Sequence, residues 1–176
     1  MRHWRHSAVS GVCEIPLPVT MAASTICENQ KEALMPEKPT IDELQAFLEK
    51  EFPQATITVE TLEDGQVWVR QPVDHSHLRP GGTVSGPTMM ATADCAAYVA
   101  VLARIGIVPL AVTSNLNINF LRKPEAGQPL MAKASILHLG RRSALSEVEI
   151  FSEGGSEKPV AHAVVTYALP SSQTGP

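Results

Sequence analysis

One carboxylate, Asp94, lies in the middle of an otherwise apolar stretch that runs from residue 86 to residue 106. Burying a carboxylate is costly unless a partner or a function compensates for its lost hydration. In such a position it can act as a general base or as a nucleophile. The structural alternative is that Asp94 caps a neighbouring loop or pairs with an arginine such as Arg79. The residues alone leave both interpretations open.

The other residue types that could do chemistry form weaker patterns. His75 and His77 are close enough to share a metal ion, but no third ligand follows at a suitable spacing. Cys95 lies beside Asp94 without an obvious histidine base, which is typical of a buried, inert cysteine. We therefore expect no metal site.

Composition excludes several classes of protein. The chain has 176 residues, 44% of them hydrophobic and 18% charged, with a formal net charge of −4. This is enough apolar material for one domain with a core, and it lacks the basic excess of a nucleic-acid-binding protein. The three cysteines are an odd number without metal-ligand spacing, which favours a reduced, cytoplasmic protein.

The first 39 residues have no sustained apolar period, and we interpret them as a flexible tail. A signal peptide is not expected, because Glu14, Pro16 and Pro18 interrupt the apolar core that it would need. We expect one domain over residues 40–170 and a disordered tail over residues 171–176.

The domain is predicted to open with a helix in TIDELQAFLEKEF, where Thr40 is the N-cap and Glu43 completes a capping box. Two alternating segments, ATITVETL and QVWVRQPV, surround a turn that contains Gly65 and predict a β-hairpin. Four further strand-like segments with short connections predict antiparallel neighbours, over residues 109–121, 128–140, 143–153 and 158–169.

A second helix is predicted over residues 86–106, with Pro87 in its first turn and Gly106 at its end. It is apolar on every side, so it must be surrounded by protein or by lipid. Lipid is not expected, because the apolar run is slightly short and contains Asp94. We therefore expect an α+β fold in which a long antiparallel sheet wraps around one central helix, the hotdog arrangement.

The sequence also resembles a known family. The segments SGPTMMATADCAAYVAVLARIG, LAVTSNLNINFLRKPEAGQPLMAKASILHLGRRSALSEVEIF and AHAVVTY are similar to those of the phenylacetate-type (PaaI-like) acyl-CoA thioesterases, hydroxybenzoyl-CoA thioesterases included. The resemblance covers roughly residues 55–169. It implies a homotetramer of hotdog dimers that hydrolyses acyl-CoA without metal or cofactor, in active sites shared between subunits.

The resemblance also implies roles for individual residues. The family's helix acid matches Asp94, which would serve as general base or nucleophile. Thr113 would help to position the water, and the shared site implies that it comes from the other subunit. Gly86 matches the position whose backbone N–H polarises the thioester carbonyl. The family's His-Gly-Gly at the helix start is here Ser85-Gly86-Pro87, so a shorter hydroxyl replaces the histidine.

Coenzyme A carries phosphates, so basic residues are expected at its site, where arginine forks match phosphate geometry. The alternative for each candidate is ordinary solvated charge. Arg79 stands where the family commonly has an asparagine. The candidates for substrate binding are Arg79, Gly140, Arg141, Arg142, Arg122 and Lys123, together with Asn115. Asn115 shares a strand face with two further asparagines, and this face lines the acyl or pantetheine channel or else meets solvent or a partner subunit.

Two other functions stay open. With Ser85 and Pro87 at the helix start, the protein could be a module that holds acyl-CoA and turns it over poorly or not at all. A hotdog dehydratase or hydratase would need a catalytic histidine facing the helix acid, and His75 and His77 are the nearby candidates. The spacing of the motifs favours the thioesterase.

Overall fold

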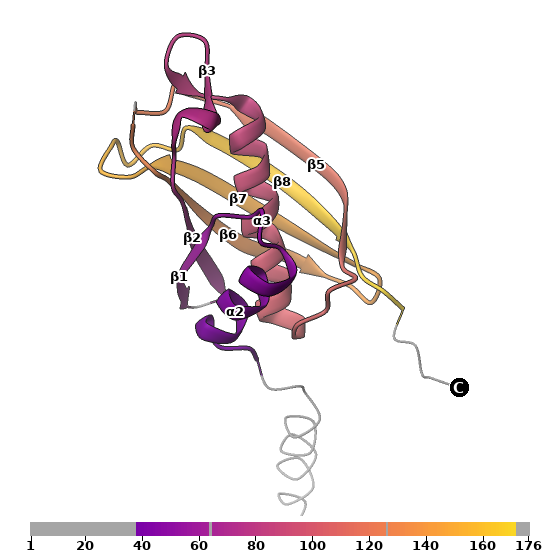
Figure 1. Cartoon of the computed structure of the whole chain (residues 1–176). Helices are drawn as coiled ribbons and strands as arrows, with labels where there is room; N and C mark the ends of the chain where they lie inside the picture. The colour runs from indigo at the N-terminus through magenta and orange to yellow at the C-terminus, as the bar shows by residue number, and fades with distance from the viewer. Residues whose placement is uncertain (1–37, 64, 126, 172–176) are drawn as a thin grey trace, which may run out of the picture. The chain divides into compact units, whose positions relative to one another are not determined.

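The computed structural model of the chain describes residues 38–63, 65–125 and 127–171, and Figure 1 shows their arrangement. Most of the two predicted tails lies outside these ranges, and so do the cysteines Cys13 and Cys27. Six strands form one antiparallel sheet in the order β1-β2-β6-β7-β8-β5. Their bounds are Thr58–Glu63 for β1, Gln66–Gln71 for β2, Val112–Phe120 for β5, Leu130–Leu139 for β6, Ser143–Ser152 for β7 and Ala161–Ala168 for β8.

Helix α3 (Gly86–Ile105) lies across one face of this sheet (Figure 1). Its alanines at 93, 96 and 97 are fully buried, and such small side chains let the sheet approach the helix closely. By length and composition α3 could cross a membrane, but most of it is buried inside the protein, as in a core helix. The predicted hotdog fold is confirmed.

Helix α2 (Ile41–Glu51) begins with the predicted capping box between Thr40 and Glu43. Leu44 and Leu48 bury its apolar face. Gln45 also links α2 to the start of the sheet, because its Oε1 accepts from the N–H of Val59 at 3.0 Å. One edge of the sheet, at β1, is therefore covered by a helix.

The opposite edge is β5, whose outer side pairs with nothing in the described chain. Exposed apolar side chains lie at both of its ends, with Leu110 and Val112 at the start and Phe120 and Leu121 at the finish. An open nine-residue edge flanked by apolar surface is typical of a site where another chain pairs.

The predicted strands are each slightly longer than the observed ones, and the loop before α3 contains structure that the sequence did not predict. Residues 109–110 form a turn, so β5 begins at Val112. Residues His75–His77 form a short 3-10 helix, and β3 (Leu78–Arg79) pairs with β4 (Thr83–Val84). Gly81 and Gly82 have positive φ angles of 94° and 71° and allow this tight reversal.

Candidate active site

Two hydroxyl groups contact the carboxylate of Asp94. Thr113 donates from Oγ1 to Asp94 Oδ1 at 2.6 Å. Tyr167 donates to the same Oδ1 at 2.8 Å and to the backbone carbonyl of Asp94 at 3.0 Å. Within the described chain, Oδ2 of Asp94 has no hydrogen-bond partner. One carboxylate oxygen is therefore held in place while the other stays available.

An irregularity in β5 makes this arrangement possible. Thr113 lies opposite Tyr167 and Asn115 opposite Thr166, so Ser114 is an extra residue in β5. Its hydroxyl donates to the carbonyl of Thr166 at 3.1 Å. In a regular strand Thr113 would point to the same face as Asn115, but a bulge reverses the alternation. The bulge thus turns the Thr113 side chain toward α3.

The expectation that Thr113 and Asp94 come from different subunits is wrong. Their 2.6 Å contact lies within one chain, because only a short loop connects α3 to β5. The alternative ion pair with Arg79 is not formed either. Arg79 lies in β3 beside the start of α3, and the described partners of Asp94 are hydroxyls.

Asp94, Thr113 and Tyr167 line a pocket of about 360 Å³. Phe47 and Phe52 of the α2 region form part of its wall. Tyr98 stacks on Tyr167, with ring centroids 5.6 Å apart and planes 20° apart. Burial raises the pKa of Tyr167, so this side chain is a neutral donor at physiological pH.

Cys95 also lines this pocket, but its thiol is unsuited to nucleophilic chemistry. Burial, and secondarily the charge of Asp94, raises the pKa of Cys95 to about 12. The thiolate is the reactive form of cysteine, and almost none is present at neutral pH. The prediction that Cys95 is inert agrees with this environment.

The start of α3 presents one free backbone donor. Ser85 is the N-cap, and its Oγ accepts from the N–H of Thr88 at 3.3 Å. The N–H of Met89 donates to the carbonyl of Ser85 at 3.2 Å, and Pro87 has no N–H. Among the described residues, the N–H of Gly86 is left without an acceptor. Ser85 therefore fixes the helix start, while Gly86 offers the hydrogen bond.

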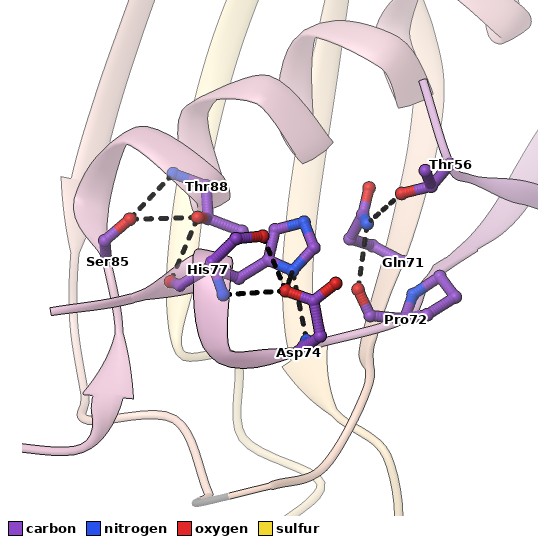
Figure 2. Close-up of polar contacts among 8 residues, drawn as sticks. Thr56, Gln71, Pro72, Asp74, His77, Ser85 and Thr88 are labelled. Carbon is purple, nitrogen blue, oxygen red and sulfur yellow. Dashed lines mark hydrogen bonds and ion pairs between the residues drawn. The ribbon is translucent and has the colours of Figure 1, made fainter. Parts of the chain in front are cut away.

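Figure 2 shows how the preceding loop holds this helix start. The carbonyl of His77 accepts from Thr88 Oγ1 at 3.1 Å and from the N–H of Ser85 at 2.9 Å. The ring of His77 accepts from the N–H of Asp74 at 3.0 Å through Nδ1. His77 lines a different pocket from Asp94, so the described chain does not bring together the acid and histidine that a dehydratase would need.

The predicted basic residues fall into two separate groups. Arg79, Arg122 and Lys123 line a pocket of about 490 Å³ that also contains Gly86. The turn with Arg141 and Arg142 lies at the other end of α3, in a second pocket of about 790 Å³. Apolar side chains share this second pocket, among them Ile105, Val108, Leu139 and Leu169. Asn115 is exposed on β5 and lines neither pocket.

Sequence reasoning missed Tyr167 and the aromatic wall. A signal for Tyr167 was available, because it has the same alternation as the buried residues Ala161, Ala163 and Val165. A tyrosine in that row has to find a partner for its hydroxyl. Phe47 carries no such signal, since only the docking of α2 brings it to the pocket.

Comparisons with known proteins support the fold and a thioesterase family. Residues 81–158 match the profile of the Thioesterase superfamily. A protein from Silicibacter sp. TM1040 that has a crystal structure and a provisional thioesterase name is 46% identical in sequence to this chain. The match covers 74% of this chain and 91% of that protein, with a TM-score of 0.68. A mutant of the phenylacetic acid degradation protein PaaI from Thermus thermophilus is 30% identical, with coverage of 71% and 99% and a TM-score of 0.57. Zebra fish thioesterase superfamily member 2 shares the fold at 20% identity, with coverage of 75% and 99% and a TM-score of 0.65. No curated protein sequence matches the chain.

Proposed function

Because the chain belongs to the thioesterase superfamily, as a PaaI-like hotdog thioesterase, we propose that it hydrolyses acyl-CoA thioesters to a free acid and coenzyme A. The observation that carries this proposal is the Asp94 carboxylate, held through Oδ1 by Thr113 and Tyr167 with Oδ2 available in a pocket. A free carboxylate oxygen can take a proton from water or attack the carbonyl itself.

One chain cannot supply both the oxyanion donor and the base. Gly86 and Asp94 are eight residues apart on one helix, which corresponds to about 12 Å along its axis. A reacting carbonyl has to lie within hydrogen-bond reach of the donor and close to the base or its water. Met90 is midway between them and is 40% exposed. A second copy related by a two-fold axis near Met90 would bring Gly86 of one copy to Asp94 of the other.

Strand β5 supports the same two-fold axis. Phe120 lies beside Gly86, since a Cβ on that glycine would be 3.2 Å from the ring, and Thr113 contacts Asp94. Antiparallel pairing of two β5 edges near Leu116 would bring Thr113 of one copy close to Phe120 of the other. The helix and the open edge therefore favour one and the same homodimer. The homotetramer that the resemblance implies would combine two such dimers.

We assign the nucleotide of coenzyme A to the turn Gly140-Arg141-Arg142. From Asp94 to the end of α3 at Ile105 is about 16 Å along the helix axis. The pantetheine arm has the length of about four extended residues, roughly 14 Å. A thioester at Asp94 thus puts the diphosphate near Arg141 and Arg142, and the apolar side chains of that pocket suit the adenine.

In this mechanism, Oδ2 of Asp94 takes a proton from a water molecule as the water oxygen attacks the thioester carbon. The N–H of Gly86 and the positive end of the helix dipole stabilise the oxyanion that forms. The carbon–sulfur bond then breaks, and the leaving sulfur receives the proton. In the nucleophilic variant, Oδ2 attacks directly and water hydrolyses the resulting anhydride. Both variants use the same oxygen.

The test is release of free thiol from a panel of acyl-CoA thioesters. We expect Asp94→Asn to lower kcat by about 10²- to 10⁴-fold, the range of general acid–base catalysis. Asp42→Asn on the exposed face of α2 is the matched control. Undiminished hydrolysis in Asp94→Asn would contradict the mechanism. Binding of acyl-CoA without any thiol release would favour the alternative, a non-catalytic acyl-CoA-binding protein. We also expect a cytoplasmic location, since Cys95 is a free thiol.

A further inference from the structure

The pocket at the start of α3 carries more positive charge than an oxyanion site needs. Arg79, Arg122 and Lys123 line it together with Gly86. Among the described residues, no carboxylate lies within ion-pair distance of these three cations. The guanidinium of Arg122 is oriented by a hydrogen bond from Nη1 to the carbonyl of Pro159 at 2.7 Å. An oriented cation without a counter-ion, next to a helix N-terminus, attracts an anion.

The rest of this pocket is apolar apart from Thr83, whose hydroxyl donates to the carbonyl of Val84 at 3.3 Å. Val84 and Met89 are buried in its wall, and Phe120 and Leu121 are about half exposed at its rim. Ligand pockets combine an apolar lining with a few polar groups that fix orientation. A chain of methylene groups that ends in an anionic group matches this combination.

The phosphates of coenzyme A do not suit this pocket if Gly86 supplies the oxyanion donor. The pantetheine arm separates the thioester from the diphosphate by roughly 14 Å. Cations that share a pocket with Gly86 are too close to the reacting carbonyl to hold the phosphates of the same molecule. The acyl group is the part of the substrate that remains within their reach.

On the basis of the proposed function, we propose that this pocket binds the far end of the acyl group and that this end is a carboxylate. The substrate class is the CoA monothioesters of dicarboxylic acids. The carboxylate accepts hydrogen bonds from Arg79 and Arg122, and Lys123 adds a third positive charge. A monocarboxylic acyl chain of the same length fits the apolar wall but leaves the cations without a partner, so it is the poorer substrate.

The test compares adipoyl-CoA with hexanoyl-CoA, which have equal chain length and differ in the terminal carboxylate. We expect kcat/KM to be at least about tenfold higher for adipoyl-CoA, the effect of one charge-assisted hydrogen bond. In the double variant Arg79→Gln/Arg122→Gln this ratio should fall toward one. Arg104→Gln, an exposed arginine in the last turn of α3, is the matched control and should keep the wild-type ratio.

Equal efficiency of the two thioesters in the wild type, or a ratio that survives the double variant, overturns the inference. A different result is that the double variant loses kcat/KM equally for both CoA thioesters and not for the matching pantetheine thioesters. That result assigns the cations to the phosphates of coenzyme A and also overturns the inference. If neither thioester is hydrolysed, the proposed function fails, and calorimetry on the intact thioesters decides the inference. Tighter binding of adipoyl-CoA that is lost in the double variant still supports it, and equal binding overturns it.

Discussion

Replacing Tyr167 by phenylalanine removes one hydroxyl and keeps the ring that stacks on Tyr98. Tyr167 is 3% exposed, and its hydroxyl is one of two donors to Oδ1 of Asp94. A hydrogen bond to a charged group contributes about 1.5–3 kcal/mol. We therefore expect kcat/KM of Tyr167→Phe to fall about ten- to a hundredfold, because the carboxylate loses the contact that fixes its orientation.

The same substitution should also have a distinct signature in the separate kinetic constants. In the proposed mechanism the Tyr167 hydroxyl positions the Asp94 carboxylate and has no contact with the substrate. The loss should therefore appear in kcat and leave KM near its wild-type value. The measurement is hydrolysis of one acyl-CoA over a range of substrate concentrations.

Tyr98→Phe is the matched control, because its hydroxyl lies in the same pocket but donates to the carbonyl of Pro109 at 3.3 Å. It should leave kcat near its wild-type value. If Tyr167→Phe leaves both kcat and kcat/KM within about twofold of wild type, the hydroxyl does not hold Asp94 in the working enzyme. If both variants lower kcat equally, the polarity of the pocket is responsible and the specific hydrogen bond is not.

Three further predictions follow from the same geometry. Asp94→Ala should lose most of kcat and keep its melting temperature near wild type or above, because Tyr167 still donates to the backbone carbonyl of residue 94; an unfolded variant would make Asp94 structural. Arg141→Ala/Arg142→Ala should raise KM for acyl-CoA, spare kcat and leave an acyl-pantetheine thioester nearly unaffected; equal losses for both substrates would point to a role in the fold. Light scattering should give a mass above 18.9 kDa for the wild type at micromolar concentration. In a triple variant that replaces Asn115, Asn117 and Asn119 by aspartate, repulsion between like charges across the proposed two-fold axis should reduce that mass.

The elements of this fold could be predicted because each has a local signal. The capping box at Thr40 and Glu43 defines where α2 begins, and Pro87 and Gly106 mark the two ends of α3. The apolar surface on all sides of α3 required a surrounding sheet, and the short connections between strands required antiparallel pairing. Asp94 stood out for the same reason, as a charge where every neighbour is apolar.

The partners of Asp94 could not be predicted, because they depend on a local exception to the rule used to read the strand. Strict alternation puts Thr113 on the face of the exposed residues Asn115 and Asn117, away from α3. One extra residue, Ser114, reverses the phase for Thr113 alone, and nothing in the letters VTSNLNINF marks Ser114 as that residue.

The same limit applies to the cations. Arg79 and Arg122 are 43 positions apart in the sequence, and they share a pocket because the β3–β4 hairpin and the end of β5 both meet the start of α3. A site that combines a bulge, a hairpin and, in our proposal, a second copy of the chain depends on tertiary geometry. The sequence therefore indicated the residue types but not their grouping.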